Sequence, residues 1–247
     1  MAQYDALARF YDAVTGEPVE LVALLHDALA RHAPSARRVL ELGCGTGAVL
    51  AGLGSDLLLT GVDLSEAMLT RAALRLPNAR LLRGDITTLD MGETFDVVVC
   101  VCDTLNHVTS DDGWRAVIDV AHSHLEPGGL FIVDVNTRRR LRDLADLGEW
   151  VDDVDELTLI TSVEFSSEPL ATWDIRIFER LDNTTYRLHH EVIAERAIET
   201  DELVASLTQS FEVLEVVDSE GFDTSTIAPR AVVIARRRDE SDDIWTS

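Results

Sequence analysis

Lysine is absent from this chain of 247 residues, and its 21 basic residues, all arginine, face 45 acidic ones, giving a formal net charge of −24. A charge of that sign and size repels phosphate backbones and anionic lipid, so we expect neither nucleic acid nor a membrane as a partner. No apolar run approaches the roughly 20 residues that span a bilayer. The opening MAQYDALARF lacks the charged-then-apolar pattern of a signal peptide, so we expect a cytoplasmic protein.

Cysteine is scarce as well. The three cysteines, Cys44, Cys100 and Cys102, form no C-x-x-C arrangement and cannot all pair. Cys100 and Cys102 lie two apart in an apolar run, so they are expected on one strand face as small core residues. We therefore expect all three thiols to be reduced, with no structural disulfide.

Glycine, in contrast, is concentrated in one stretch, RRVLELGCGTG at residues 37–47. The apolar run before it predicts a short buried strand, and the residues after it predict a helix. Gly43, Gly45 and Gly47 then occupy the turn between them, where a bare backbone lets a ligand approach closely. A tight turn with positive φ would account for one or two of these glycines. Three at alternate positions after Glu41 favour a ligand site.

Strands and helices alternate over the first half of the chain. Strands are predicted at residues 37–42, 57–62, 79–83, 95–102 and 129–135, and helices at 20–32, 46–53, 65–76 and 112–126, the last closed by Pro127-Gly128-Gly129. Continuous apolar runs such as FDVVVCVC are typical of strands covered on both faces. The fold class is therefore α/β, a doubly wound, mostly parallel sheet.

The pattern changes after residue 136. A helical stretch precedes three strands that alternate like antiparallel ones, and a helix at 200–209 and two final strands return to the main sheet. We therefore expect a ligand-binding domain at 1–136 and 199–238, with residues 1–18 as a helical N-terminal lid. Residues 137–198 form an inserted antiparallel β cap that binds the substrate, and 239–247 form an acidic tail.

Polar residues follow the ends of four successive predicted strands. Because open α/β sheets bind ligands in the crevice outside the carboxyl ends of their strands, these residues are expected to share one site. Any single carboxylate among them could instead be a helix N-cap. The set comprises Glu41, Asp63, Asp85, Asp103, Asn106 and His107.

At these positions the chain resembles the class I S-adenosylmethionine-dependent methyltransferases. VLELGCGTG, GVDLSEAML, GDI, FDVVVC and LEPGGLFIVD stand in that family's order, and the resemblance covers residues 37–135 and the last two strands. It implies a Rossmann-like fold, S-adenosyl-L-methionine as cofactor and transfer of a methyl group. The family's substrate amines and hydroxyls react by in-line displacement, for which the protein aligns the nucleophile and excludes water.

The resemblance also implies roles for single residues. The backbone at Gly43–Gly45 would border the methionine part of the cofactor, Asp63 would hold the ribose hydroxyls, and Leu64 and Met68 would flank the adenine. The full implied set is Tyr11, Glu41, Gly43, Cys44, Gly45, Asp63, Leu64, Met68, Asp85, Ile86, Cys102 and Asp103.

The layout is most similar to the small-molecule branch with an antiparallel cap, which includes sugar-amine and glycine-type N-methyltransferases. A small amine is therefore the expected acceptor, with a hydroxyl or a peptide N-terminal amine left open. The segment at 103–106 lacks the prolines that follow the fourth strand of DNA-amine methyltransferases. His107 is the candidate proton acceptor, and Tyr4, Asn106, Trp173 and Arg176 are candidate substrate contacts.

Several alternatives remain. Asp134 and Asn136 only faintly resemble the ligands of metal-dependent catechol methyltransferases, and His189 and His190 point to opposite strand faces, so we predict no metal. A nicotinamide-dependent oxidoreductase is disfavoured because the G-x-G-x-G spacing is one residue short of the dinucleotide fingerprint. A non-catalytic nucleotide-binding protein on the same fold stays open. A monomer and a homodimer are both compatible with the chain.

Overall fold

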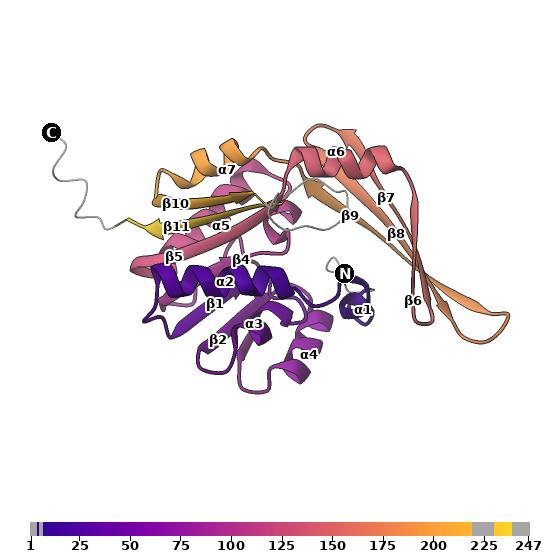
Figure 1. Cartoon of the computed structure of the whole chain (residues 1–247), viewed down its shortest axis with the longest axis horizontal. Helices are drawn as coiled ribbons and strands as arrows, with labels where there is room; N and C mark the ends of the chain where they lie inside the picture. Colours follow the sequence, from indigo (N-terminus) through magenta and orange to yellow (C-terminus); the bar gives the residue numbers. More distant parts are fainter. Residues whose placement is uncertain (1–3, 5–6, 219–229, 239–247) are drawn as a thin grey trace.

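The computed structural model describes residues 4, 7–218 and 230–238, so the predicted acidic tail lies outside the described residues. Its main sheet has seven strands in the order β10-β11-β5-β4-β1-β2-β3 (Figure 1). Strands β5 to β3 in that order are parallel, and β11 is antiparallel to both β5 and β10. The strands are β1 (Arg38–Leu42), β2 (Leu58–Asp63), β3 (Arg80–Arg83), β4 (Phe95–Cys100), β5 (Leu125–Asn136), β10 (Phe211–Asp218) and β11 (Arg230–Arg237).

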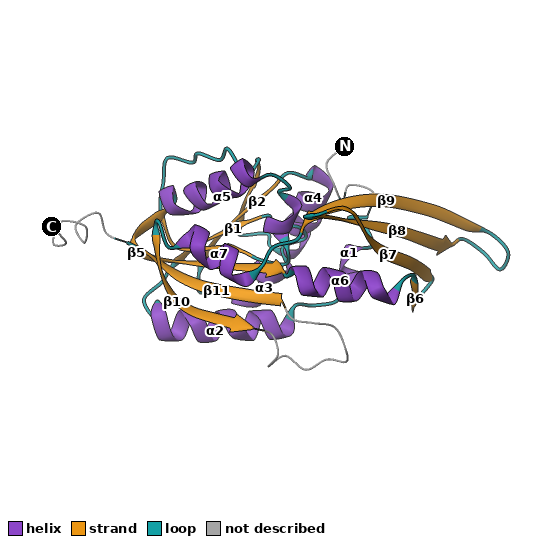
Figure 2. Ribbon diagram, turned by 90° about the horizontal axis from the view of Figure 1, so that it is seen from above, coloured by secondary structure: helices purple, strands orange, loops and turns teal. Residues whose placement is uncertain are grey.

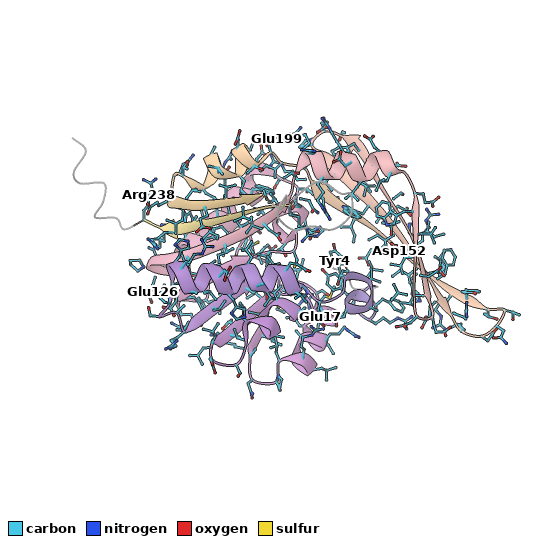
Figure 3. The ribbon with its side chains drawn as sticks, viewed as in Figure 1. Tyr4, Glu17, Glu126, Asp152, Glu199 and Arg238 are labelled. Atoms are coloured by element: carbon cyan, nitrogen blue, oxygen red, sulfur yellow. The ribbon has the colours of Figure 1, made fainter. Side chains whose placement is uncertain are left out.

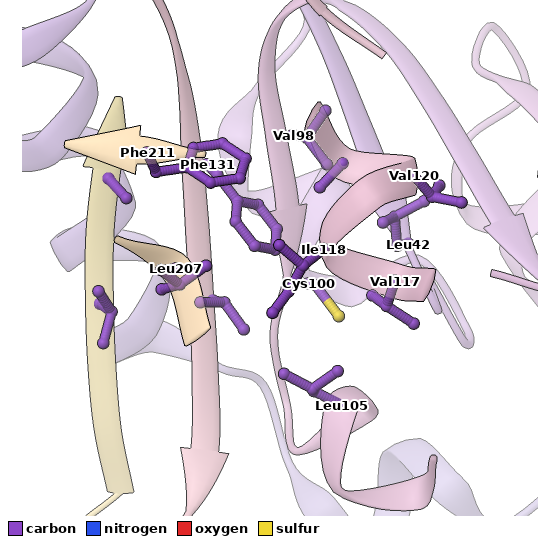
Figure 4. Close-up of a cluster of buried hydrophobic side chains, with 14 of the residues drawn as sticks. Leu42, Val98, Cys100, Leu105, Val117, Ile118, Val120, Phe131, Leu207 and Phe211 are labelled. Atoms are coloured by element: carbon purple, nitrogen blue, oxygen red, sulfur yellow. The ribbon is translucent and has the colours of Figure 1, made fainter. Parts of the chain in front are cut away.

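Alternation along the central strands sends neighbouring side chains into two separate cores, one on each face of the sheet. In β4, Val97 and Val99 belong to one core and Val98 and Cys100 to the other. Figure 4 shows the core that contains Val98 and Cys100, where Phe131 of β5 packs beside Phe211 of β10. Both faces are thus buried, which explains why these strands are continuously apolar.

The helices divide between these two faces. α2 (Val19–His32) and α3 (Ala48–Leu53) contribute buried side chains to one core, and α4 (Glu66–Arg75) packs partly against it. α5 (Asp111–Ser123) and α7 (Thr200–Leu207) supply the other core. The doubly wound, mostly parallel α/β sheet predicted from the sequence is confirmed.

The end of α5 differs from the prediction. The helix stops at Ser123 and β5 already begins at Leu125, so Pro127-Gly128-Gly129 lies within the strand rather than closing the helix. Pairing with β4 jumps from Phe95↔Leu125 to Val97↔Leu130, so the turn-prone residues are absorbed as an irregularity of the ladder.

A second, antiparallel sheet of four strands lies beside the first, in the order β6-β7-β8-β9 (Figures 1 and 2). Its strands are β6 (Trp150–Val154), β7 (Leu157–Ser167), β8 (Leu170–Arg180) and β9 (Tyr186–Arg196). α6 (Arg138–Leu147) packs on it through Leu141 and Leu144. The sequence had indicated only three strands, because the short β6 reads as the end of the preceding helix. We call this second sheet the cap sheet.

The N-terminal arm lies between the two sheets (Figure 1). Among the described residues of the arm, only α1 (Tyr11–Thr15) is helical and residues 7–10 form turns, so this part of the arm is less helical than predicted. Leu7 and Phe10 are buried against Leu159, Ile177 and Ile193 of the cap sheet. The arm and α6 thus cover different parts of the same apolar face of the cap sheet.

Candidate functional site

A cavity of about 1050 Å³ lies where the carboxyl ends of the parallel strands meet the arm and the cap sheet. Figure 3 places Tyr4 between the two sheets, beside this space. Its walls differ by origin. The main sheet contributes the glycine turn and several carboxylates, whereas the cap sheet contributes mostly apolar and aromatic side chains, namely Trp150, Leu159, Trp173, Ile175 and Ile177, together with the polar Asp152, Thr161 and Glu195.

The glycine turn follows β1 directly. Gly43, Gly45 and Gly47 have φ values of 76°, 52° and 76°, in the left-handed region that glycine enters without strain. The N–H groups of Gly43 and Cys44 both donate to the carbonyl oxygen of Val62, at 2.8 and 2.9 Å. The first N–H groups of the turn are therefore used inside the fold.

The side chain of Asp63 connects the same turn to the start of α4 through hydrogen bonds. Its carboxylate accepts the N–H of Gly45 through Oδ2 at 2.8 Å and that of Ser65 through Oδ1 at 2.8 Å. Burial raises the pKa of this carboxyl, and the backbone hydrogen bonds partly oppose the rise. A carboxylate with two oxygens keeps further lone pairs for a ligand hydroxyl.

This arrangement is poorly suited to a pyrophosphate. A dinucleotide-binding turn needs free N–H groups and no negative charge beside them, but here Val62 and Asp63 hold the N–H groups of residues 43–45 and Asp63 adds a charge. The turn favours a ligand that is cationic or carries hydroxyls.

Glu41 lies under the turn with 2% of its surface exposed. Its Oε2 has no hydrogen-bond partner among the described residues, although it lines the cavity. Burial, and then the charge of Asp63, raise the pKa of this carboxyl well above its usual range. A buried acceptor without a partner is costly, and a cationic ligand group would relieve that cost.

A strained turn forms the floor of the cavity. Cys102 and Asp103, directly after β4, have φ values of 58° and 56°, which non-glycine residues rarely adopt. The buried carboxylate of Asp134 holds them there, accepting the N–H of Cys102 at 2.9 Å and that of Asp103 at 2.7 Å. Arg230 Nη2 donates to Asp103 Oδ1 at 2.7 Å and completes the network. The two strained residues, Cys102 and Asp103, thus lie where the reacting groups are expected.

The arm adds an aromatic cluster above this floor. The hydroxyl of Tyr4 is 3.0 Å from His107 Nε2, and the rings of Tyr4 and Tyr11 meet edge to face at 5.7 Å. His107 belongs to η1 (Thr104–His107), the single helical turn after β4. Burial lowers the pKa of His107 and raises the pKa of Tyr4, so both side chains are held neutral near pH 7.

Most of the predicted site residues meet in this cavity. Those lining it are Tyr4, Tyr11, Glu41, Gly43, Cys44, Gly45, Asp63, Leu64, Met68, Asp85, Ile86, Cys102, Asp103, His107 and Trp173.

Two predicted substrate contacts lie elsewhere. Asn106 is fully buried, and its Nδ2 donates to the carbonyl oxygens of Asn136 and Arg196 at 2.9 Å each, so it joins the two sheets instead of facing a ligand. Arg176 lies on the opposite face of β8 from Trp173, outside the cavity, paired with Glu149 and with Asp174.

The cavity residues that were not assigned to the site from the sequence include the charged side chains Asp134, Arg140, Glu195 and Arg230. Asp134 follows the same strand-end rule as the predicted acids, so its position in FIVDVN was a usable signal. No comparable sequence signal pointed to Glu195, because the sequence of an antiparallel strand does not show which of its two faces will lie toward the cavity. The atoms of Asp103, His107 and Glu195 that could bind a cation all lie within 4.8 Å of one another.

The comparisons with known proteins find methyltransferases. Residues 39–129 match a family described as "Methyltransferase domain". A dTDP-4-amino-2,3,4,6-tetradeoxy-D-glucose N,N-dimethyltransferase of Saccharopolyspora spinosa is 34% identical over 54% of this chain and 51% of its own. A protein of Geobacillus sp. (strain WCH70), provisionally named a methyltransferase, is 27% identical over 86% of this chain and 90% of its own. The chain thus spans about half the length of the sugar dimethyltransferase it matches.

Structural similarity extends further along the chain. The crystal structure of a S-adenosylmethionine-dependent methyltransferase from Clostridium acetobutylicum ATCC 824 superposes with a TM-score of 0.82 at 23% identity, covering 96% of this chain and 99% of that one. The Rossmann-like fold, with its antiparallel addition, is shared. The comparisons give no support to an oxidoreductase. Within the described part of the chain, no helix is both long and apolar enough to cross a membrane.

Proposed function

We propose that the chain transfers a methyl group from S-adenosyl-L-methionine to the nitrogen of a small-molecule amine, and the match of residues 39–129 to a methyltransferase domain supports this. The observation that carries the proposal is the glycine turn, whose first N–H groups are already bonded and whose surroundings are acidic. Such a turn suits a cationic, hydroxyl-bearing nucleoside without phosphates. S-adenosylmethionine has all three properties.

The residues present fit that cofactor. Asp63 would accept the ribose hydroxyls, and the unpartnered Oε2 of Glu41 would lie near the cationic methionine end. Leu64, about half exposed, and Met68 would flank the base. When bound, the cofactor supplies an electrophilic methyl carbon on a sulfonium, and the nitrogen–carbon bond forms as the carbon–sulfur bond breaks with its electron pair left on sulfur.

The cap sheet would determine the specificity for the acceptor. Its inner face offers Trp150, Trp173 and Ile175 as apolar walls, and excluding water there strengthens every charge interaction at the floor. The sugar dimethyltransferase among the relatives acts on an amine of a nucleotide-linked sugar, which supports a sugar amine as the acceptor class. A hydroxyl acceptor is the alternative outcome of the assay below.

His107 would take up a proton from the acceptor. It is held neutral by burial, and Nε2 faces the floor beside Asp103, at 3.8 Å from Oδ2. The hydroxyl of Tyr4 fixes the ring's orientation. The N-terminal arm would therefore complete the site when it closes, since Tyr4 belongs to it. That no metal is used, that the chain acts as a monomer or homodimer, and that it works in the cytoplasm remain predictions.

Calorimetry with S-adenosylmethionine and with NAD tests the cofactor, and we expect binding of the first alone. Release of labelled methyl to a panel of dTDP-amino sugars, other small amines and the matching alcohols tests the reaction. Transfer to amines is the expected result. Binding of NAD, or cofactor binding without transfer to any acceptor of the panel, would contradict the proposal.

A further inference from the structure

The side chain of Asp12, in α1, connects the N-terminal arm to the cofactor half of the cavity. Its Oδ1 accepts a hydrogen bond from the hydroxyl of Thr46 at 2.5 Å, and its Oδ2 pairs with Nη2 of Arg75 at 2.9 Å. Thr46 belongs to the glycine turn and has 2% of its surface exposed, and Arg75 is the last residue of α4. One carboxylate therefore joins the arm to both elements that frame the expected cofactor.

The residues beside Asp12 form part of the cavity wall. Tyr11 lines the cavity together with Gly43, Gly45 and Thr46, and so do residues 14–18, which follow Asp12 in the arm. Moving α1 away from the glycine turn would therefore open the wall around the space in which the cofactor is expected.

The cap sheet is firmly attached to the main sheet. The side chain of Asn106 donates to the carbonyl oxygens of Asn136 and Arg196, which lie on the two segments that connect the sheets. The N–H of Arg138 donates to the carbonyl oxygen of Ile198 at 2.9 Å across the same junction. A swing of the cap sheet would break these bonds, so access to the cavity is expected to depend on the arm.

The two ends of the arm are held by different forces. Leu7 and Phe10 are 5% and 7% exposed and pack on the cap sheet. Asp12 is held by polar contacts, and its side chain remains 28% exposed. Water can replace polar contacts at a partly exposed carboxylate at little cost, whereas exposing buried apolar surface is unfavourable. The arm is therefore expected to open at Asp12 while Leu7 and Phe10 stay on the cap sheet.

The position of the Thr46 hydroxyl depends on the conformation of the glycine turn. Thr46 lies between Gly45 and Gly47, which have φ values of 52° and 76°. A ligand that rests on the backbone of the turn would hold this conformation, and with it the hydroxyl that Asp12 accepts. Ligand binding and closure of the arm then favour each other by the same factor, as linkage requires.

We propose that Thr46 and Asp12 form a latch between the glycine turn and the arm, which keeps α1 over the bound cofactor and limits the release of S-adenosylhomocysteine after methyl transfer. Both are positioning residues, because they act through α1 rather than on the reacting atoms. The inference rests on the proposed methyl transfer and adds the contact that sets the rate of cofactor release.

The test measures how fast tritium-labelled S-adenosylhomocysteine dissociates when excess unlabelled ligand is added, with samples taken by rapid filtration. Thr46→Val keeps the shape of the side chain but removes its hydroxyl, so dissociation should be about tenfold faster or more, as expected for the loss of a hydrogen bond to a charged group. Thr46→Ser retains the hydroxyl and should release the ligand nearly as slowly as the wild type. Asp12→Ala should also speed release. The double variant should be no faster than Asp12→Ala alone, because both changes remove the same contact.

Thr70→Val is the matched control, because it removes the same hydroxyl from an exposed position of α4, where it donates to the carbonyl oxygen of Glu66 in the same helix. Release of S-adenosylhomocysteine from this variant should equal release from the wild type.

Amide hydrogen exchange measures closure of the arm independently of release. The N–H groups of Val14 and Gly16 donate to the carbonyl oxygens of Phe10 and Asp12. S-adenosylhomocysteine should slow the exchange of both amides in the wild type but not in Thr46→Val. A general loss of stability would instead speed exchange throughout the main sheet.

Unchanged release from folded Thr46→Val, fast release from Thr46→Ser, or exchange at Val14 and Gly16 that the ligand does not slow in the wild type would each overturn the proposal. If Thr46→Val does not fold, Asp12→Ala decides the matter, because the Asp12 side chain is partly exposed. Failure of the wild type to bind S-adenosylhomocysteine contradicts the proposed function instead, so the two failures are distinguishable.

Discussion

Replacing Asp63 by alanine probes both the architecture of the glycine turn and its expected ligand. The carboxylate accepts two backbone N–H groups, from Gly45 and Ser65, each at 2.8 Å. An orphaned buried donor costs about 1–3 kcal/mol. Loss of two such bonds is partly offset, because burial already disfavours the charged form of Asp63. We therefore expect the free energy of unfolding to fall by about 1–3 kcal/mol.

Ligand affinity should fall in the same variant. Ribose hydroxyls that lose a charged acceptor cost roughly 1–3 kcal/mol, so S-adenosylmethionine should bind about 5- to 150-fold more weakly. Urea unfolding measures the first effect and calorimetry the second. Asp90→Ala is the control, since Asp90 accepts a single N–H, from Gly92, in an exposed turn away from the cavity. A folded Asp63→Ala protein with unchanged stability and affinity would refute the reasoning.

Three further outcomes are expected. Glu195→Gln should raise the melting temperature at pH 7, because the raised pKa of Glu195 means that folding opposes its ionisation. This gain should vanish below about pH 4, where the carboxyl is protonated in the unfolded chain as well. An equal gain at both pH values would contradict this cause. Deletion of residues 1–14 should abolish turnover while calorimetric melting stays cooperative at a lower temperature, because Leu7 and Phe10 leave the cap sheet; full turnover after deletion would argue against a lid. Trp173→Ala should raise the acceptor's KM and leave cofactor affinity nearly unchanged, whereas Arg176→Ala, on the other face of β8, should change neither; parallel losses of acceptor and cofactor would exclude this division of labour.

Much of the ligand site was predictable because its signals are local. A glycine turn between a strand and a helix needs only neighbouring residues, and the strand-end rule converts the order of parallel strands into a shared edge. Asp63, Asp85 and Asp103 therefore line one cavity, although they lie 40 residues apart at the extremes. The two glycine positions flanking Cys44 likewise adopt positive φ, as a bare turn requires.

The substrate-binding side of the cavity was harder to predict from the sequence. Trp173 and Arg176 are three residues apart on one strand, so alternation alone excludes both from the same face. Which of them faces the cavity depends on how the cap sheet is placed against the main sheet. Asn106 illustrates the same limit, because this polar residue beside the predicted site serves the junction of the two sheets, donating to the carbonyl oxygen of Arg196.

The sequence by itself determined the doubly wound sheet, the glycine turn and the acids at the strand ends, since each follows from spacing within a short segment. Only the tertiary structure decided the floor of the cavity. There Glu195 meets Asp103 across 92 positions, and Arg230 meets Asp103 across 127. Contacts between such distant segments depend on how the two sheets pack, and no local periodicity encodes that packing.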